Sequence, residues 1–156
     1  MSARAEELAT QFEQANESLV QAIQPMSDAQ WAAQTPEEGW SVAVAAHHAA
    51  ASAEPLTYFV QCASTGQPLP PITPERLNGI NAQHATDFAN VSKQDVVAAV
   101  NKNVPVTAAL LRSLSDEQLQ KTADTPFMGG MTTEQIIQNV LIGHVQGHLA
   151  SIQGAK

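Results

Sequence analysis

Apolar residues recur every three or four positions along most of the chain, which is the spacing of amphipathic helices. The first such stretch covers residues 2–24 and ends at Pro25, and its apolar positions are Leu8, Phe12, Ala15, Leu19 and Ile23. Ala, Gln, Glu and Leu dominate, and stretches of alternating β-branched and aromatic residues are missing. The pattern predicts a chain that is helical throughout.

Polar capping residues and prolines mark the ends of the later helices. They delimit a long helix over residues 41–64, a shorter helix from Thr73, a helix over 92–114 with Pro105 as a kink, and a last helix over 132–152. Residues 27–31 and 115–119 look like two matching short helix starts, and a histidine-bearing helix follows each. The sequence predicts an all-α fold, a bundle of four or five helices.

Composition narrows the class of protein. A chain of 156 residues is most simply one domain, residues 1–156. Its net charge of −8 argues against nucleic acid as a partner, because phosphate binding needs a basic surface. No apolar stretch is long enough to span a membrane. The single cysteine, Cys62, excludes an internal disulfide and suits a cytoplasmic protein.

Two histidines lie one helical turn apart in the last helix. His144 and His148 fall on the same stripe as Ile137, either Val140 or Leu141, and Ile152. A spacing of four residues aims both imidazoles to the same side, as chelation of one metal ion requires. A pair of core histidines bonded to their neighbours would show the same spacing, so this pair alone leaves both interpretations open.

A third histidine favours the metal interpretation. His48 belongs to a stripe of the second helix that the period places toward the core, and the other members are Val44, Ala51, Pro55, Phe59 and Cys62. His47 points about 100° away, toward the side of Glu54, and is interpreted as a surface or groove residue. Two histidines from one helix and one from another make a three-nitrogen site with open positions, which is typical of catalytic rather than structural metal sites.

These motifs, in this order, resemble the DinB/YfiT-like metalloenzyme superfamily. The residues that carry the resemblance are Gly39-Trp40-Ser41-Val42, His48 eight positions after Trp40, and the paired histidines of the final helix. The resemblance covers essentially the whole chain. It implies a four-helix bundle of unusual connectivity with short extra helices, and a divalent metal bound by His48, His144 and His148.

The chain departs from the family pattern beside two of these histidines. Members often carry an acidic residue just after the first histidine of the last helix and a Gly-Gln pair after the second. Here Val145 follows His144, and Leu149, Ala150 and Ser151 follow His148. Polar neighbours of ligands tune metal affinity, so the departure puts the usual chemistry in doubt more than the metal site itself.

The resemblance implies a metal-dependent enzyme that uses a low-molecular-weight thiol, as an S-transferase or isomerase acting on a small electrophile. A metal-dependent hydrolase is the first alternative, and a non-catalytic helical module that binds a metal or ligand is the second. Zinc or nickel is the expected metal, with iron as a third choice, because three imidazoles suit several ions. A homodimer is also expected.

Four further residues are candidates for the pocket around the site: Glu54, Tyr58, Cys62 and His84. The first three follow His48 on the same helix. His84 lies in a polar stretch, so a solvated position or a role at the edge of the pocket is expected for it rather than metal ligation. A lone helical cysteine is more often a small buried apolar residue. Glu54 and Tyr58 would by default lie on the solvated face.

Overall fold

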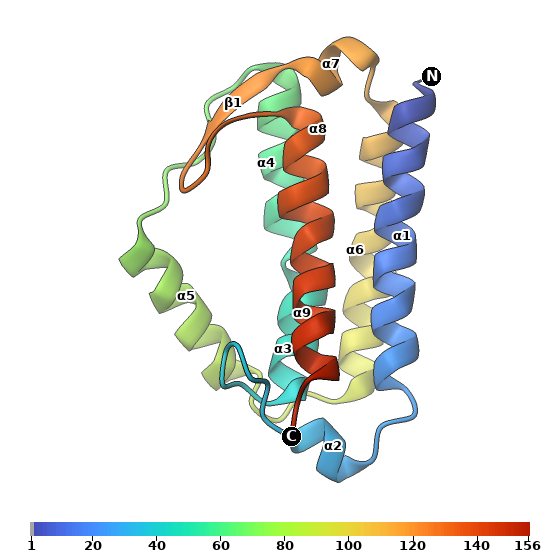
Figure 1. Ribbon diagram of the computed structural model, residues 1–156, viewed down its shortest axis with the longest axis vertical. Helices are drawn as coiled ribbons and strands as arrows, with labels where there is room; N and C mark the ends of the chain where they lie inside the picture. Colours follow the sequence, from blue (N-terminus) through green and yellow to red (C-terminus); the bar gives the residue numbers. More distant parts are fainter. Residues whose placement is uncertain (1) are drawn as a thin grey trace.

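Four long helical segments lie side by side in a computed structural model that describes residues 2–156 (Figure 1). They are α1 (Ala3–Ile23), α3 followed by α4 (Val42–Ala51 and Ala53–Thr65), α6 (Lys93–Ser113), and a last segment made of α8 (Thr133–Gln135), η1 (Ile136–Ile142) and α9 (Gly143–Gln153). Shorter helices connect them: α2 (Asp28–Ala32), α5 (Pro74–Asp87) and α7 (Asp116–Gln120). The predicted four-helix bundle with short extra helices is confirmed.

The core lies along α1, which packs against α6 and α9. Leu8, Phe12, Leu19 and Ile23 of α1 are fully buried, as their spacing predicts. Burial of such side chains is the main source of the bundle's stability, at roughly 1.5–3 kcal/mol for each. No helix within residues 2–156 is long and apolar enough to cross a membrane.

The predicted long second helix is interrupted at Ser52, between α3 and α4. Pro55 has no N–H to donate to the carbonyl of Ala51 four residues earlier, so the helical ladder cannot run unbroken through this point. The buried side chain of Asn103, on α6, donates from Nδ2 to the carbonyl oxygen of Ala50 at 3.1 Å. This hydrogen bond from a neighbouring helix supports the break from inside the bundle.

Replacing Asn103 by alanine is expected to lower the free energy of unfolding by about 1–3 kcal/mol, because the buried carbonyl of Ala50 loses its donor. Urea unfolding followed by circular dichroism measures the change. Asn101→Ala is the matched control, since Asn101 is exposed on the same helix. Equal losses in the two variants would contradict a structural role for the Asn103 hydrogen bond.

The last segment begins as predicted. The Thr132 side chain accepts a hydrogen bond from the backbone N–H of Gln135, and the Gln135 side chain accepts one from the N–H of Thr132. The helix then widens into a π-helix over η1 before it returns to α-helix at Gly143. A Cβ at Gly143 would lie 3.2 Å from the carbonyl oxygen of Gln138, a tight contact that glycine avoids.

A short β-hairpin corrects the expectation that the chain is helical throughout. Its strands, β1 (Thr122–Thr125) and β2 (Gly129–Thr132), pair antiparallel with Thr125 opposite Gly129. Gly129 has φ of 69°, in the left-handed region that favours glycine. Pro126 and two glycines make this segment a poor helix former, and it forms strands because its two halves pair across the turn.

Helix α5 stands apart from the bundle on the side where the hairpin extends (Figure 1). It begins as the sequence predicts, with Thr73 as its cap and Pro74 at its first position. None of its residues is fully buried. The space between α5 and the bundle is a cavity, and Leu77 and Ile80 of α5 line it.

Candidate metal centre

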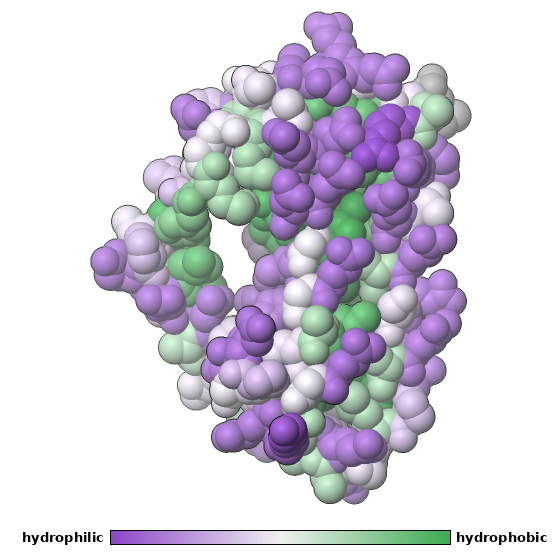
Figure 2. Space-filling view, viewed as in Figure 1, coloured by the Kyte–Doolittle hydropathy of each residue, from purple (hydrophilic) through white to green (hydrophobic). Residues whose placement is uncertain are grey.

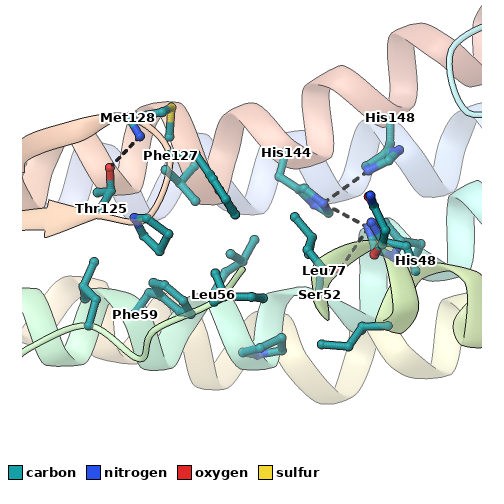
Figure 3. Close-up of a pocket in the computed structure, with 18 of the residues that line it drawn as sticks. His48, Ser52, Leu56, Phe59, Leu77, Thr125, Phe127, Met128, His144 and His148 are labelled. Carbon is teal, nitrogen blue, oxygen red and sulfur yellow. Dashed lines mark hydrogen bonds between the residues drawn. The ribbon is translucent and has the colours of Figure 1, made fainter. Parts of the chain in front are cut away.

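Three histidine side chains from two segments of the bundle converge at one end of this cavity (Figure 3). His48 comes from α3, and His144 and His148 come from α9. Nε2 of His144 lies 3.2 Å from Nε2 of His48 and 3.2 Å from Nε2 of His148. One nitrogen of each ring lies within 4.8 Å of the others, so the cluster could hold a metal ion.

All three imidazoles are held in the neutral form that binds metals. Burial, followed by the neighbouring histidines, lowers the pKa of His48 to about 3. Burial and His148 lower the pKa of His144 to about 4. Burial also lowers the pKa of His148, although the charge of Glu38 opposes it. At neutral pH each ring therefore offers one nitrogen lone pair and one N–H.

The nitrogen lone pairs of the three histidines are placed so that they can bind a cation. His148 Nδ1 lies 2.7 Å from a carboxylate oxygen of Glu38, outside hydrogen-bond alignment but close enough for the negative charge to favour the proton of this ring on Nδ1, which leaves Nε2 with a lone pair. Nε2 of His144 can donate a hydrogen bond to only one of its two nitrogen neighbours. Nδ1 of His144 is buried and has no hydrogen-bond partner among the described residues. A cation between the three Nε2 atoms would engage their lone pairs at once.

Glu38 is the residue of the site that sequence reasoning missed. It lies in the loop before α3, with Oε1 beside His148 Nδ1 and Oε2 accepting a hydrogen bond from Ser151 at 2.7 Å. Burial raises its pKa, but hydrogen bonds from Ser151, Thr35 and its own backbone N–H, together with the electrostatic effect of His148, outweigh burial, so the pKa lies below its usual value and the group is charged. Its position directly before Gly39, the first residue of the resemblance motif, was the available signal.

Trp40 packs over the same cluster. Its ring lies parallel to that of His148, with centroids 6.4 Å apart, and meets His48 edge-on at 5.2 Å. In the structure it also lines the cavity and restricts the orientations open to two of the three histidines.

The prediction that the stripe of His48 faces the core holds only at its two ends: Val44 and Cys62 are buried, whereas the four residues between them are not. The core side of α3 and α4 carries Val42, Ala46, Ala49 and Val60, all fully buried. His48 is instead half-buried, and it lines the cavity together with Pro55 and Phe59. His144 and His148 are likewise half-buried, beside the apolar stripe of α9 rather than within it. The break at Ser52 rotates α4 relative to α3, and the π-helix rotates α9 relative to the residues before it. A stripe drawn through either irregularity therefore does not stay on one face.

The prediction that His47 is a surface or groove residue is wrong. His47 is 8% exposed, because α5 and the loop after it cover this side of α3. Its ring stacks on Phe88 with centroids 3.9 Å apart, and its Nδ1 lies 3.2 Å from Nε2 of His84. The His84 ring also meets His48 edge-on at 5.2 Å. His84 therefore lies beside the cluster, at the edge of the site.

The cavity itself measures about 740 Å³ and is lined by residues of α3, α4, α5, the hairpin and the last segment. None of the four predicted pocket residues lines it, although His84 lies beside the histidine cluster. Glu54 is exposed and lies 3.9 Å from Lys102. Tyr58 is 54% exposed, and Cys62 is buried elsewhere on α4. They follow His48 in sequence, but the helix turns them away from the cavity.

Val145, where members of the resembled family often carry an acidic residue, is 2% exposed and belongs to the hydrophobic core. A side chain at this position points away from the three histidines. The carboxylate that supports the cluster comes from Glu38, on a different part of the chain. Ser151, in the stretch that replaces the Gly-Gln pair, orients that carboxylate.

Several solved structures share this fold. YfiT from Bacillus subtilis, described as "a probable metal-dependent hydrolase with an unusual four-helix bundle topology", matches with a TM-score of 0.79 at 22% identity, over 99% of this chain and 87% of its own. A mycothiol-dependent maleylpyruvate isomerase matches with a TM-score of 0.73 at 19% identity, over 99% of this chain and 64% of its own. The sibling lethal factor precursor DfsB matches with a TM-score of 0.72 at 16% identity, over 99% of this chain and 95% of its own.

At these identities the likeness shows the fold alone. This chain spans less than two thirds of the isomerase. No curated protein matches the sequence. The sequence profile of the DinB superfamily, however, matches residues 11–152, which include all three clustered histidines and Glu38. The chain belongs to the DinB superfamily.

Proposed function

We propose that His48, His144 and His148 bind one divalent metal ion, with zinc or nickel as the first choices and iron as the third. The observation that carries this proposal is the convergence of three neutral Nε2 atoms at one end of a cavity. The contact between Glu38 and His148 supports it, because a metal-binding histidine commonly donates its other N–H to a carboxylate.

We infer that the chain is an enzyme and not only a metal-binding module. Three protein ligands leave at least one coordination position open, which is typical of catalytic sites. When bound, such an ion acts as a Lewis acid that lowers the pKa of a ligand thiol or water and polarises an electrophile. The three histidines face the cavity, so a substrate in the cavity can reach the open position.

The protein's own residues would orient the reacting groups. Glu38 fixes the ring of His148 through Nδ1, and Trp40 covers His148 and His48 on one side and excludes water there. The hydroxyl of Ser52 lines the cavity 3.5 Å from Nε2 of His48. It can exchange a hydrogen bond with a substrate oxygen or thiol next to the cluster.

The reaction we propose is transfer of a thiol to a small electrophile, or a thiol-assisted isomerisation. The family membership supports it, together with the shared fold of an isomerase that depends on mycothiol. Hydrolysis is the second candidate, which the description of YfiT favours. The two differ in the nucleophile, which is a thiol in the first reaction and water in the second.

Metal analysis of the purified protein is expected to give about one zinc or nickel ion per chain, retained through gel filtration. The ion is expected to be removed by a chelator and restored by added zinc or nickel. His144→Ala is the matched variant, because it removes the central nitrogen of the cluster. Wild-type protein that cannot be loaded with either ion would contradict the proposal.

Activity assays then distinguish thiol transfer, hydrolysis and metal binding without catalysis. Loaded protein with mercaptoethanol and chlorodinitrobenzene tests thiol transfer, and nitrophenyl acetate without thiol tests hydrolysis. We expect turnover in the first assay, and its loss in His144→Ala. Turnover in the second assay alone would support hydrolysis. Metal binding without turnover in either assay would favour a binding module.

A further inference from the structure

The walls of the cavity are almost entirely apolar. Within residues 2–156 the lining contains no lysine or arginine, and its ionisable groups are Glu38 and the three histidines, all at one end. Away from the histidines the wall is formed mainly by side chains such as Leu56, Phe59, Leu77, Ile136 and Val140. The volume of about 740 Å³ lies in the range of pockets that hold drug-sized ligands.

The apolar lining continues to the surface. Ile80 on α5 and the hairpin-tip residues Phe127 and Met128 line the cavity and are 49%, 53% and 55% exposed. In the space-filling view an opening separates α5 from the bundle, and hydrophobic residues border it (Figure 2). Exposed apolar side chains that border a cavity mark a binding surface, because covering them removes apolar area from water.

The electrostatic environment of this cavity disfavours a ligand that carries a negative charge on the part buried away from the histidines. An anion buried among apolar side chains loses its hydration, and no cationic side chain of the described lining replaces it. The charged Glu38 and the net charge of −8 also repel anions. Arg76, the only arginine or lysine of α5 in residues 74–87, is exposed and does not line the cavity. A metal ion at the histidines would attract one polar group at that end and leave the rest of the cavity unchanged.

We propose that the substrate is a neutral, mainly apolar molecule whose polar reactive group lies at the three histidines and whose body lies between α5, α4 and the hairpin tip. Calling the ligand a substrate rests on the proposed function, whereas its binding needs no metal. The nucleophile that shares the cavity with such a substrate would be water, or a thiol compound without charged groups other than its sulfur, rather than a thiol compound that carries several carboxylates.

Two fluorescent probes that differ in one charge test the proposal. Phenylnaphthylamine is neutral, and anilinonaphthalenesulfonate has the same rings with an added sulfonate. We expect the neutral probe to bind the purified protein at least about tenfold more tightly, because the buried sulfonate would lose hydration without a partner. The titrations are made before and after removal of metal by a chelator.

The variant Leu77→Lys places a cation on the cavity wall, at a half-buried position of α5 (Figure 3). It is expected to reverse the preference, with tighter binding of the sulfonate and weaker binding of the neutral probe. Val106→Lys is the matched control, because Val106 is 67% exposed and lies outside this cavity. It should leave both affinities unchanged.

The outcomes are separable from those of the metal proposal. His144→Ala should lose metal yet still bind the neutral probe. The proposal is overturned if wild-type protein binds the sulfonate as tightly as the neutral probe. It is equally overturned if Leu77→Lys shifts the preference no more than Val106→Lys. If circular dichroism shows that Leu77→Lys is unfolded, Ile80→Lys replaces it, since half-exposed Ile80 tolerates a charge.

Discussion

His48→Ala is expected to abolish metal binding, from about one ion per chain to none after gel filtration, whereas His47→Ala should keep the ion. The two residues are neighbours on α3, but only His48 directs Nε2 to His144. His47 faces the other way and contacts His84 and Phe88. Metal analysis and calorimetric titration with zinc measure the difference.

His47 is nearly buried, so its replacement is also expected to lower the stability of the metal-free protein. Urea unfolding of both metal-free variants separates this effect from loss of a ligand. If His47→Ala folds and yet loses the ion as completely as His48→Ala, the assignment of His48 as the ligand from α3 is refuted.

Glu38→Gln is expected to weaken metal binding about 10–100-fold, the usual effect of removing a carboxylate that supports a metal-binding histidine. The amide keeps the size of the side chain but removes the negative charge beside His148 Nδ1. Competition with a zinc-sensitive dye measures the affinity. Glu37→Gln is the matched control, because Glu37 is the exposed neighbour in the same loop.

A positioning role for Glu38 predicts a selective effect. The metal affinity should fall while the free energy of unfolding of the metal-free protein changes little. Unchanged affinity in Glu38→Gln would show that the orientation of His148 does not depend on this carboxylate. A parallel loss of affinity and of stability would assign Glu38 to the fold rather than to the site.

The features that the sequence predicted correctly depend on local geometry. Thr132 and Gln135 close a capping box because they lie three residues apart at a helix start, and Ser92 with Asp95 does the same for α6. His144 and His148 meet because a spacing of four residues aligns them on an α-helix. These relations hold in whatever tertiary context the helices pack.

Predictions that extended a helical period too far were wrong. The stripe drawn from Val44 to Cys62 crosses the break at Ser52, and the stripe through the last segment crosses a π-helix. Each irregularity rotates the residues beyond it relative to those before it. Glu54, Tyr58 and Cys62 were taken as pocket candidates because they share a helix with His48, yet they lie away from the cavity.

By itself, then, the sequence determined the helices, their caps and the alignment of His144 with His148, because these depend on residues a few positions apart. The tertiary structure alone brought Glu38 to His148 across 110 positions of chain, placed α5 over His47, and enclosed an apolar cavity beside the histidines. Such contacts depend on how helices dock and on their rotation. Small irregularities such as the break at Ser52 and the π-helix set that rotation, and they cannot be detected from the spacing of apolar residues in the sequence.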